Sequence, residues 1–241
     1  MIYIIRHSEK LNFKHNDEWK KSQRYKKNPF DVPISKDGIK YAGECINDLL
    51  KDYDGAFSFI YSSPLTRCIE TSIIFQNYIK LKYGIVVPIR IEYGLTELEY
   101  NIMNAYNFKF NDKKKVVLKN THLPIDKELE ENNIYKKYGK QRFDVKYKSV
   151  IDKNIINGNL LYDDQYNTCL DFFNKIIRHI NKNTLTLFCT SGIVMMLLAS
   201  YINGKLDFSP YIQYRGWCMS MELELKDKKL VLKQINHGYG E

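Results

Sequence analysis

The sequence predicts an α/β fold, a three-layer sandwich on a mostly parallel sheet, from two observations. Short apolar segments that suit buried strands alternate with longer segments whose apolar residues recur every three or four positions, which is typical of βαβ units. Hydrophobic residues make up 44% of the 241 residues, which is enough to form a sizeable core. We therefore expect helices on both faces of one central sheet.

The first elements follow from local patterns. Residues 1–6 predict a strand, and the polar stretch that follows has no clear periodicity up to about Pro33. Ser35 suits the N-cap of a helix because apolar residues follow it on one helical face. The segment "AFSFIYSS" predicts a second strand, Pro64 is placed to open the next helix, and "VVPIRIEY" predicts a third strand.

The second half contains one unpatterned region. Residues from about 100 to 165 are rich in Lys, Asn and Tyr, with weak periodicity apart from a possible helix near 126–138, so we expect an inserted cap or lid there. Apolar spacing over 169–180 predicts a helix, followed by the strand "TLTLFC" and a helix from about Ile193 to Ile202. The alternating stretch "MSMELELKDKKLVLKQI" predicts a β-hairpin.

Composition limits the classes of partner. Lys and Arg number 37 against 28 acidic residues, and the net charge of +9 favours anionic partners such as phosphorylated molecules. The sequence has no Arg-rich arm, zinc-ligand spacing or RNA-binding signature, so we expect no nucleic acid partner. The longest apolar run, near 187–202, is interrupted by polar residues and predicts no membrane span.

The cysteines indicate a cellular compartment. There are five, an odd number, and none forms a C-x-x-C pair, which favours free thiols in a reducing environment. The stretch before Arg6 is too short for the apolar region of a secretory signal. We therefore expect a cytoplasmic protein.

Reactive side chains follow the predicted strands. Arg6 and His7 end the first strand, Arg67 lies in the first turn of the helix after the second, and Glu97 in "GLTELEY" follows the third. Because ligands bind beyond the carboxyl ends of parallel strands, we expect these four side chains to converge. An imidazole can attack phosphorus, guanidiniums bind phosphate oxygens, and a carboxyl can protonate a leaving group. These four side chains together could surround a phosphoryl group.

These residues carry a family resemblance. The motif "IIRHSEK" together with "YSSPLTRCIETS" resembles the paired signature of the histidine phosphatase superfamily, also called phosphoglycerate mutase-like. The similarity is closest to the branch of Sts-type phosphatases of T-cell signalling, and it continues through "FDVPISKDGIKYAGE", "GLTELEY", "FDVKYKS" and "YRGWCMSMELE". It therefore covers most of the chain in order.

The resemblance implies an activity. It predicts one domain over 1–241 and a phosphomonoester hydrolase that works through a phosphohistidine intermediate, without metal or cofactor. The substrate would be a phosphorylated small molecule or a phosphoprotein, and homodimers are common in this branch. A mutase of the phosphoglycerate type is disfavoured because the nearest resemblance is to phosphatases.

The resemblance also implies residue roles. His7 would be the nucleophile, Arg6 and Arg67 would bind the phosphate, and Glu97 would be the acid/base. Lys10 falls where the branch often has a further phosphate-contacting Arg, and a lysine supplies charge without the two-pronged geometry of a guanidinium.

One position departs from the family pattern. Relatives carry a second histidine after the strand that corresponds to "TLTLFC", and here Thr190 stands in its place. A threonine hydroxyl can donate one hydrogen bond to phosphate but brings no positive charge. Loss of one such donor typically costs about a hundredfold to a thousandfold in rate. We therefore expect reduced activity, and the alternative is a catalytically silent pseudophosphatase that binds a phosphorylated ligand or a protein partner.

Overall fold

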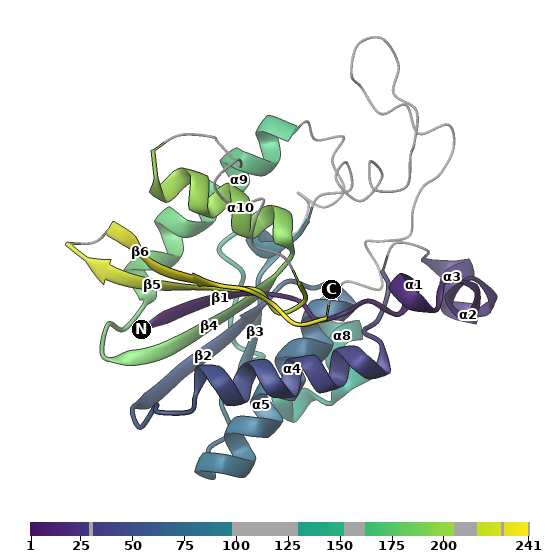
Figure 1. The fold of residues 1–241 in the computed structure, drawn as a ribbon. Helices are drawn as coiled ribbons and strands as arrows, with labels where there is room; N and C mark the ends of the chain where they lie inside the picture. The colour runs from purple at the N-terminus through teal and green to yellow at the C-terminus, as the bar shows by residue number, and fades with distance from the viewer. Residues whose placement is uncertain (29–30, 98–129, 152–161, 205–215, 228, 241) are drawn as a thin grey trace.

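A six-stranded sheet forms the centre of the described part of the chain (Figure 1). The computed structural model describes residues 1–28, 31–97, 130–151, 162–204, 216–227 and 229–240. The strand order is β3-β2-β4-β1-β5-β6. The strands are β1 (Ile2–Arg6), β2 (Ala56–Ser62), β3 (Ile89–Ile91), β4 (Thr184–Thr190), β5 (Ser220–Lys226) and β6 (Lys229–Asn236). Strands β1 to β4 pair in parallel and β5 pairs antiparallel with β1 and β6, which confirms the predicted fold class.

Helices cover both faces of this sheet (Figure 1). One face carries α4 (Lys36–Leu49), α5 (Thr66–Tyr83) and α8 (Glu131–Tyr138), and the other carries α9 (Tyr162–Ile176) and α10 (Gly192–Ile202).

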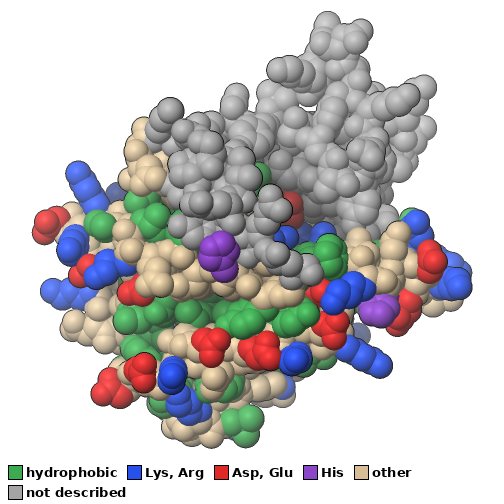
Figure 2. Space-filling model, in the orientation of Figure 1, with side chains coloured by type: hydrophobic (Ala, Val, Ile, Leu, Met, Phe, Trp, Pro, Cys, Tyr) green, Lys and Arg blue, Asp and Glu red, His purple; other side chains and the backbone are tan. Residues whose placement is uncertain are grey.

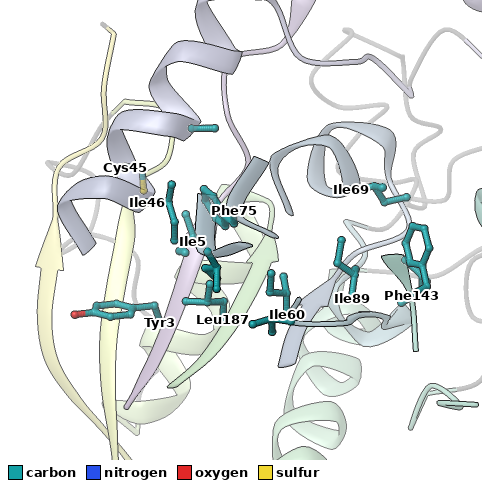
Figure 3. Close-up of a cluster of buried hydrophobic side chains, with 14 of the residues drawn as sticks. Tyr3, Ile5, Cys45, Ile46, Ile60, Ile69, Phe75, Ile89, Phe143 and Leu187 are labelled. Atoms are coloured by element: carbon teal, nitrogen blue, oxygen red, sulfur yellow. The ribbon is translucent and has the colours of Figure 1, made fainter. Parts of the chain in front are cut away.

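Strand β1 shows how the two layers are filled. Tyr3 and Ile5 join the buried cluster under α4 and α5, which is drawn in Figure 3, whereas Ile2 and Ile4 join the cluster under α9 and α10. This alternation follows from the two-residue period of a strand. The strand is apolar on both faces because it is covered on both.

The predicted helices and strands agree with the structure in kind, but several boundaries differ. The helix predicted over 169–180 is α9, which begins at Tyr162 and ends at Ile176, and a 3-10 turn follows it. Ser35 caps α4 by accepting a hydrogen bond from the Gly38 N–H at 2.9 Å, as predicted. Helix α5 begins at Thr66 instead of Pro64, because the Asp31 carboxylate accepts from the Thr66 N–H at 2.7 Å and fixes the first turn there. The third predicted strand shortens to Ile89–Ile91, just after Pro88, which has no N–H to donate.

The segment after β1 contains structure that the sequence did not predict. Three short helices, α1 (Leu11–Lys14), α2 (Asn16–Lys21) and α3 (Gln23–Lys27), lie between the strand and Pro33. Helices of four to six residues are too short to show a helical repeat in the sequence. A backbone bridge between Lys10 and Ile34 closes this segment into a loop beside the end of β1.

Most of the region predicted as an inserted cap, 98–129 and 152–161, lies outside the described residues. Within 130–151, α8 and the 3-10 turn η2 (Lys140–Arg142) pack beside edge strand β3. The Asp144 N–H donates to the Ile89 carbonyl at 2.9 Å, and Phe143 forms a parallel bridge with the same residue. Further 3-10 turns are η1 (Tyr93–Leu95) and η4 (Ile177–His179).

The C-terminal hairpin is confirmed. Lys226 of β5 pairs with Lys229 of β6, and Asp227 at the turn has a positive φ of 48°, as a tight two-residue turn requires. All five cysteines are buried, and no disulfide joins these described residues. Within the described ranges, no helix combines the length and apolar character needed to cross a bilayer. On the face drawn in Figure 2, basic and acidic side chains of the described residues are interspersed.

Candidate active site

His7 lies where β1 ends against β4. Its backbone N–H donates to the Thr190 carbonyl at 2.8 Å, and its side chain is 3% exposed. The imidazole Nδ1 lies 2.8 Å from the Ser8 carbonyl oxygen. Because a carbonyl can only accept, Nδ1 must carry the proton in this bond. In the neutral ring, Nε2 then holds an unprotonated lone pair.

The surroundings of His7 keep the ring neutral. Burial lowers its pKa well below the ordinary value, and the positive charges of Arg67, Arg6 and Lys10 lower it further. A neutral imidazole is the nucleophilic form. The electrostatics therefore favour the form that can attack phosphorus at physiological pH.

The loop after His7 is fixed by α4 and α5. The Ser8 N–H donates to the Thr71 hydroxyl at 3.0 Å, and the Ser8 hydroxyl donates to the Gly38 carbonyl at 2.6 Å. A Cβ at Gly38 would lie 2.6 Å from the Glu9 carbonyl oxygen, so only glycine allows this close approach. Ser8 therefore anchors this loop to both helices.

Arg6 extends from the end of β1 toward residues near the C-terminus. Its Nη1 donates to the Gly216 carbonyl at 3.1 Å, and its Cζ lies 4.5 Å from the centre of the Trp217 ring. Its Nε is buried and has no hydrogen-bond partner among the described residues. An N–H of this kind can serve an oxygen of a bound anion.

Arg67 of helix α5 and Glu97 of the loop after η1 form an ion pair. Arg67, in the first turn of α5, is 2% exposed, and its Nη2 lies 2.8 Å from Glu97 Oε2. Lys10 lies near both: burial lowers its pKa to about 8, Arg67 and Arg6 contribute to the lowering, and Glu97 opposes it. The predicted residues Arg6, Lys10, Arg67 and Glu97 are therefore close enough to interact electrostatically beside His7.

Thr190 lies beside His7, but its hydroxyl is engaged within the protein. The side chain is fully buried, and Oγ1 donates to the Leu95 carbonyl at 2.7 Å. A hydroxyl has one proton, so in this arrangement Thr190 has none to donate to an anion. The expected contact between the Thr190 hydroxyl and phosphate therefore requires that this bond break.

Glu92 is a buried carboxylate that the sequence analysis did not select. It follows β3 directly and accepts hydrogen bonds from the Tyr147 and Ser149 hydroxyls, both at 2.6 Å, and from the Val150 N–H at 3.1 Å. These bonds tie 147–150 to the loop that leads to Glu97. No spacing in the sequence distinguishes Glu92 from Glu99, which lies outside the described residues.

The site as a whole can bind an anion next to a neutral nucleophile. Three cations, Arg6, Lys10 and Arg67, lie near His7, and one carboxylate balances part of their charge. In the described ranges, no three His, Cys, Asp or Glu side chains are grouped so that they could hold a metal ion. Cys189 precedes Thr190, but burial raises its thiol pKa, which favours the unreactive protonated form.

The chain matches a family model and shares its fold with solved structures. Residues 2–238 match the family model described as histidine phosphatase superfamily (branch 1). No curated protein matches the chain.

Solved structures share the fold. An ecdysone phosphate phosphatase from Bombix mori in complex with tungstate is similar with a TM-score of 0.58 at 13% identity, over 100% of this chain and 96% of that one. A phosphoserine phosphatase from Entamoeba histolytica has a TM-score of 0.55 at 14% identity, over 98% and 95%. A mycobacterial glucosyl-3-phosphoglycerate phosphatase has a TM-score of 0.53 at 14% identity, over 98% of each chain.

Proposed function

This chain belongs to the histidine phosphatase superfamily, and from that membership we propose that it hydrolyses phosphomonoesters through a covalent phosphohistidine on His7. The observation that carries the proposal is the state of that imidazole. Its Nδ1 proton is held by the Ser8 carbonyl, its pKa is lowered by burial and by three cations, and its Nε2 lone pair is therefore available.

In the first step, the Nε2 lone pair attacks phosphorus and the bond from phosphorus to the ester oxygen breaks. Arg6 and Arg67 hold the phosphate oxygens as negative charge shifts to the leaving oxygen. An incoming phosphate would replace the Glu97 carboxylate on Arg67, because both are anions that compete for the same guanidinium. The released Glu97 carboxylate takes a proton from solvent and, as the neutral acid, gives that proton to the leaving oxygen.

In the second step, water attacks the phosphohistidine. Glu97, now a carboxylate, takes a proton from the water as its oxygen bonds to phosphorus, and the bond from phosphorus to Nε2 breaks. Inorganic phosphate leaves and the neutral imidazole is restored. The positive charge for both steps comes from Arg6, Arg67 and Lys10, so we propose that the reaction needs no metal ion. Activity should survive treatment with a chelator.

The motifs quoted above support placement near the Sts-type branch, and Thr190, in the place of the second histidine, supports a low rate. Its proton is used on the Leu95 carbonyl, which leaves the transferring group one donor short. The same observation favours a second candidate, a pseudophosphatase that binds a phosphorylated ligand without turning it over. The enzyme would act on a phosphorylated small molecule or a phosphoprotein, whereas the pseudophosphatase would bind a phosphorylated ligand or a protein partner. We propose a cytoplasmic setting for either.

Trapping of the covalent intermediate tests the proposal. The protein is mixed with an aryl phosphate labelled on phosphorus, quenched in alkali to preserve phosphohistidine, and digested for mass spectrometry. Label is expected on His7 and absent from His7→Ala. His179→Ala is the matched control. His179 is exposed and precedes the N-terminal end of β4, whereas His7 follows the C-terminal end of β1. Turnover without label on His7 would contradict the mechanism, and binding without turnover would favour the pseudophosphatase.

A further inference from the structure

Arg6 is held on two sides by a segment far away in the sequence. The Gly216 carbonyl accepts from Nη1 at 3.1 Å, and the Trp217 ring covers the guanidinium with its centre 4.5 Å from Cζ. The same indole lies 5.8 Å from the His7 ring. The Trp217 side chain therefore contacts the proposed phosphate-binding group and lies next to the proposed nucleophile.

Trp217 is itself rigidly supported. Its backbone N–H donates to the Tyr239 carbonyl at 2.8 Å, and the Tyr239 N–H donates back to the Trp217 carbonyl at 2.7 Å. Gly216, which precedes Trp217, has a φ of +94°, and a Cβ there would lie 2.6 Å from the backbone of Gly238. Only glycine therefore fits at position 216. The Phe13 ring packs edge-on against the indole at 5.2 Å. The indole is 5% exposed and is held from several directions.

We propose that Trp217 is a positioning residue, which fixes the Arg6 guanidinium in the orientation that receives the phosphate. This inference rests on the proposed function because it concerns the same site. One face of the guanidinium lies on the indole and Nη1 is engaged by a carbonyl. Of its remaining N–H groups, Nε has no hydrogen-bond partner in the described part of the chain. A guanidinium constrained in this way loses little conformational freedom when an anion binds.

The size of the effect follows from the contact. A cation is stabilised by an aromatic ring beneath it, and more so in a partly desolvated site. Removal of the indole should therefore weaken anion binding by Arg6 about tenfold. Phenylalanine offers a smaller aromatic face, so Trp217→Phe should lose only about threefold. Leucine fills space without a π-face, so Trp217→Leu should show the full loss.

A double-mutant cycle with sulfate as the anion tests whether Trp217 acts through Arg6. Sulfate affinity is measured by calorimetry at fixed pH and ionic strength for wild type, Trp217→Leu, Arg6→Met and the double variant. Trp217→Leu should weaken sulfate about tenfold when Arg6 is present and have no effect in the Arg6→Met background. Trp217→Phe should weaken sulfate only about threefold.

A matched control separates this effect from a general loss of packing. Phe57→Leu removes a half-buried ring that contacts Tyr53 and Tyr83 at 5.2 Å and 5.1 Å. Phe57 lies near the N-terminal end of β2, whereas Arg6 lies at the C-terminal end of β1. This variant should be less stable and bind sulfate normally. Phe13→Ala, at a side chain that is 54% exposed, provides a second test if Trp217→Leu does not fold, with an expected loss of about twofold that again depends on Arg6.

The outcomes are distinct from those of the trapping experiment. Unchanged sulfate affinity in Trp217→Leu and Phe13→Ala would overturn the proposal, as would equal losses with and without the Arg6 guanidinium. Absence of sulfate binding by the wild-type protein would overturn it as well. A wild-type protein that binds sulfate with the expected coupling but forms no phosphohistidine would leave Trp217 in its role and refute the phosphatase instead.

Discussion

Substitution of Lys10 by Arg should remove a pH dependence of anion binding that the wild-type protein shows. Burial lowers the pKa of Lys10 to about 8, and the charges of Arg67 and Arg6 add to this lowering. Lys10 therefore loses its charge as the pH rises through 8, and the site loses one of its three cations. A guanidinium stays charged from pH 7 to about 9, so Lys10→Arg should bind an anion equally well at both pH values.

The magnitude follows from the titration. With a pKa of about 8, the ammonium form makes up about nine tenths of Lys10 at pH 7 and about one tenth at pH 9. If sulfate binds only the charged form, its affinity falls about tenfold over that interval, or about 1.4 kcal/mol. Sulfate remains a dianion throughout, and His7, whose pKa is far lower, stays neutral. The slope therefore reports on Lys10.

Calorimetric titration with sulfate at pH 7, 8 and 9, at one ionic strength, measures this profile. Wild type should lose affinity with rising pH and take up about half a proton per sulfate at pH 8. The sulfate affinity of Lys10→Arg should not change with pH. The affinity of Lys10→Met should be low and should not change with pH either. A level wild-type profile, or the same decline in Lys10→Arg, would refute the assignment of this titration to Lys10.

Three further variants have defined outcomes. Thr190→His should raise aryl phosphate turnover by about a hundredfold by restoring a cationic donor, and His7→Ala should abolish the activity in both backgrounds; no gain in a folded variant would favour the pseudophosphatase. Glu92→Ala removes the buried acceptor of the Tyr147 and Ser149 hydroxyls and of the Val150 N–H and should lower the free energy of unfolding in urea by about 3 kcal/mol. Asp31→Ala removes the carboxylate that accepts from the Thr66 N–H at the start of α5 and should cost about 1 kcal/mol by the same measurement. Because Arg67 lies in that first turn, sulfate binding should weaken too, and normal binding would show that the Asp31 carboxylate does not orient Arg67.

Residues at the ends of strands could be predicted to share a site without knowledge of any side-chain conformation. Arg6 ends β1, His7 and Arg67 follow parallel strands, and the carboxyl ends of such strands meet at one edge of the sheet. Glu97 reaches the same edge through η1. This argument needs only the order and type of the elements, which apolar periodicity indicates.

Contacts that depend on distant segments or on rotamers could not be predicted. Trp217 lies 210 residues after His7 in the chain, and nothing in its local pattern indicates that its ring would cover Arg6. The direction of the Thr190 hydroxyl depends on a carbonyl in another loop, at Leu95. Glu92 gains its role from hydroxyls more than fifty residues later. Each of these requires the tertiary structure.

The position of β1 between β4 and β5 has a consequence for the order of events during synthesis. Residues 2–6 pair with 186–190 on one side, and residues 2–5 pair with 220–223 on the other. At typical translation rates, the ribosome needs about 10 to 40 s to produce the intervening chain. During that time the strand that precedes His7 has no partner, although it is among the most apolar segments of the protein. The geometry around the nucleophile can therefore form only after most of the chain has emerged, and β1 is the segment that we expect a nascent-chain chaperone to protect.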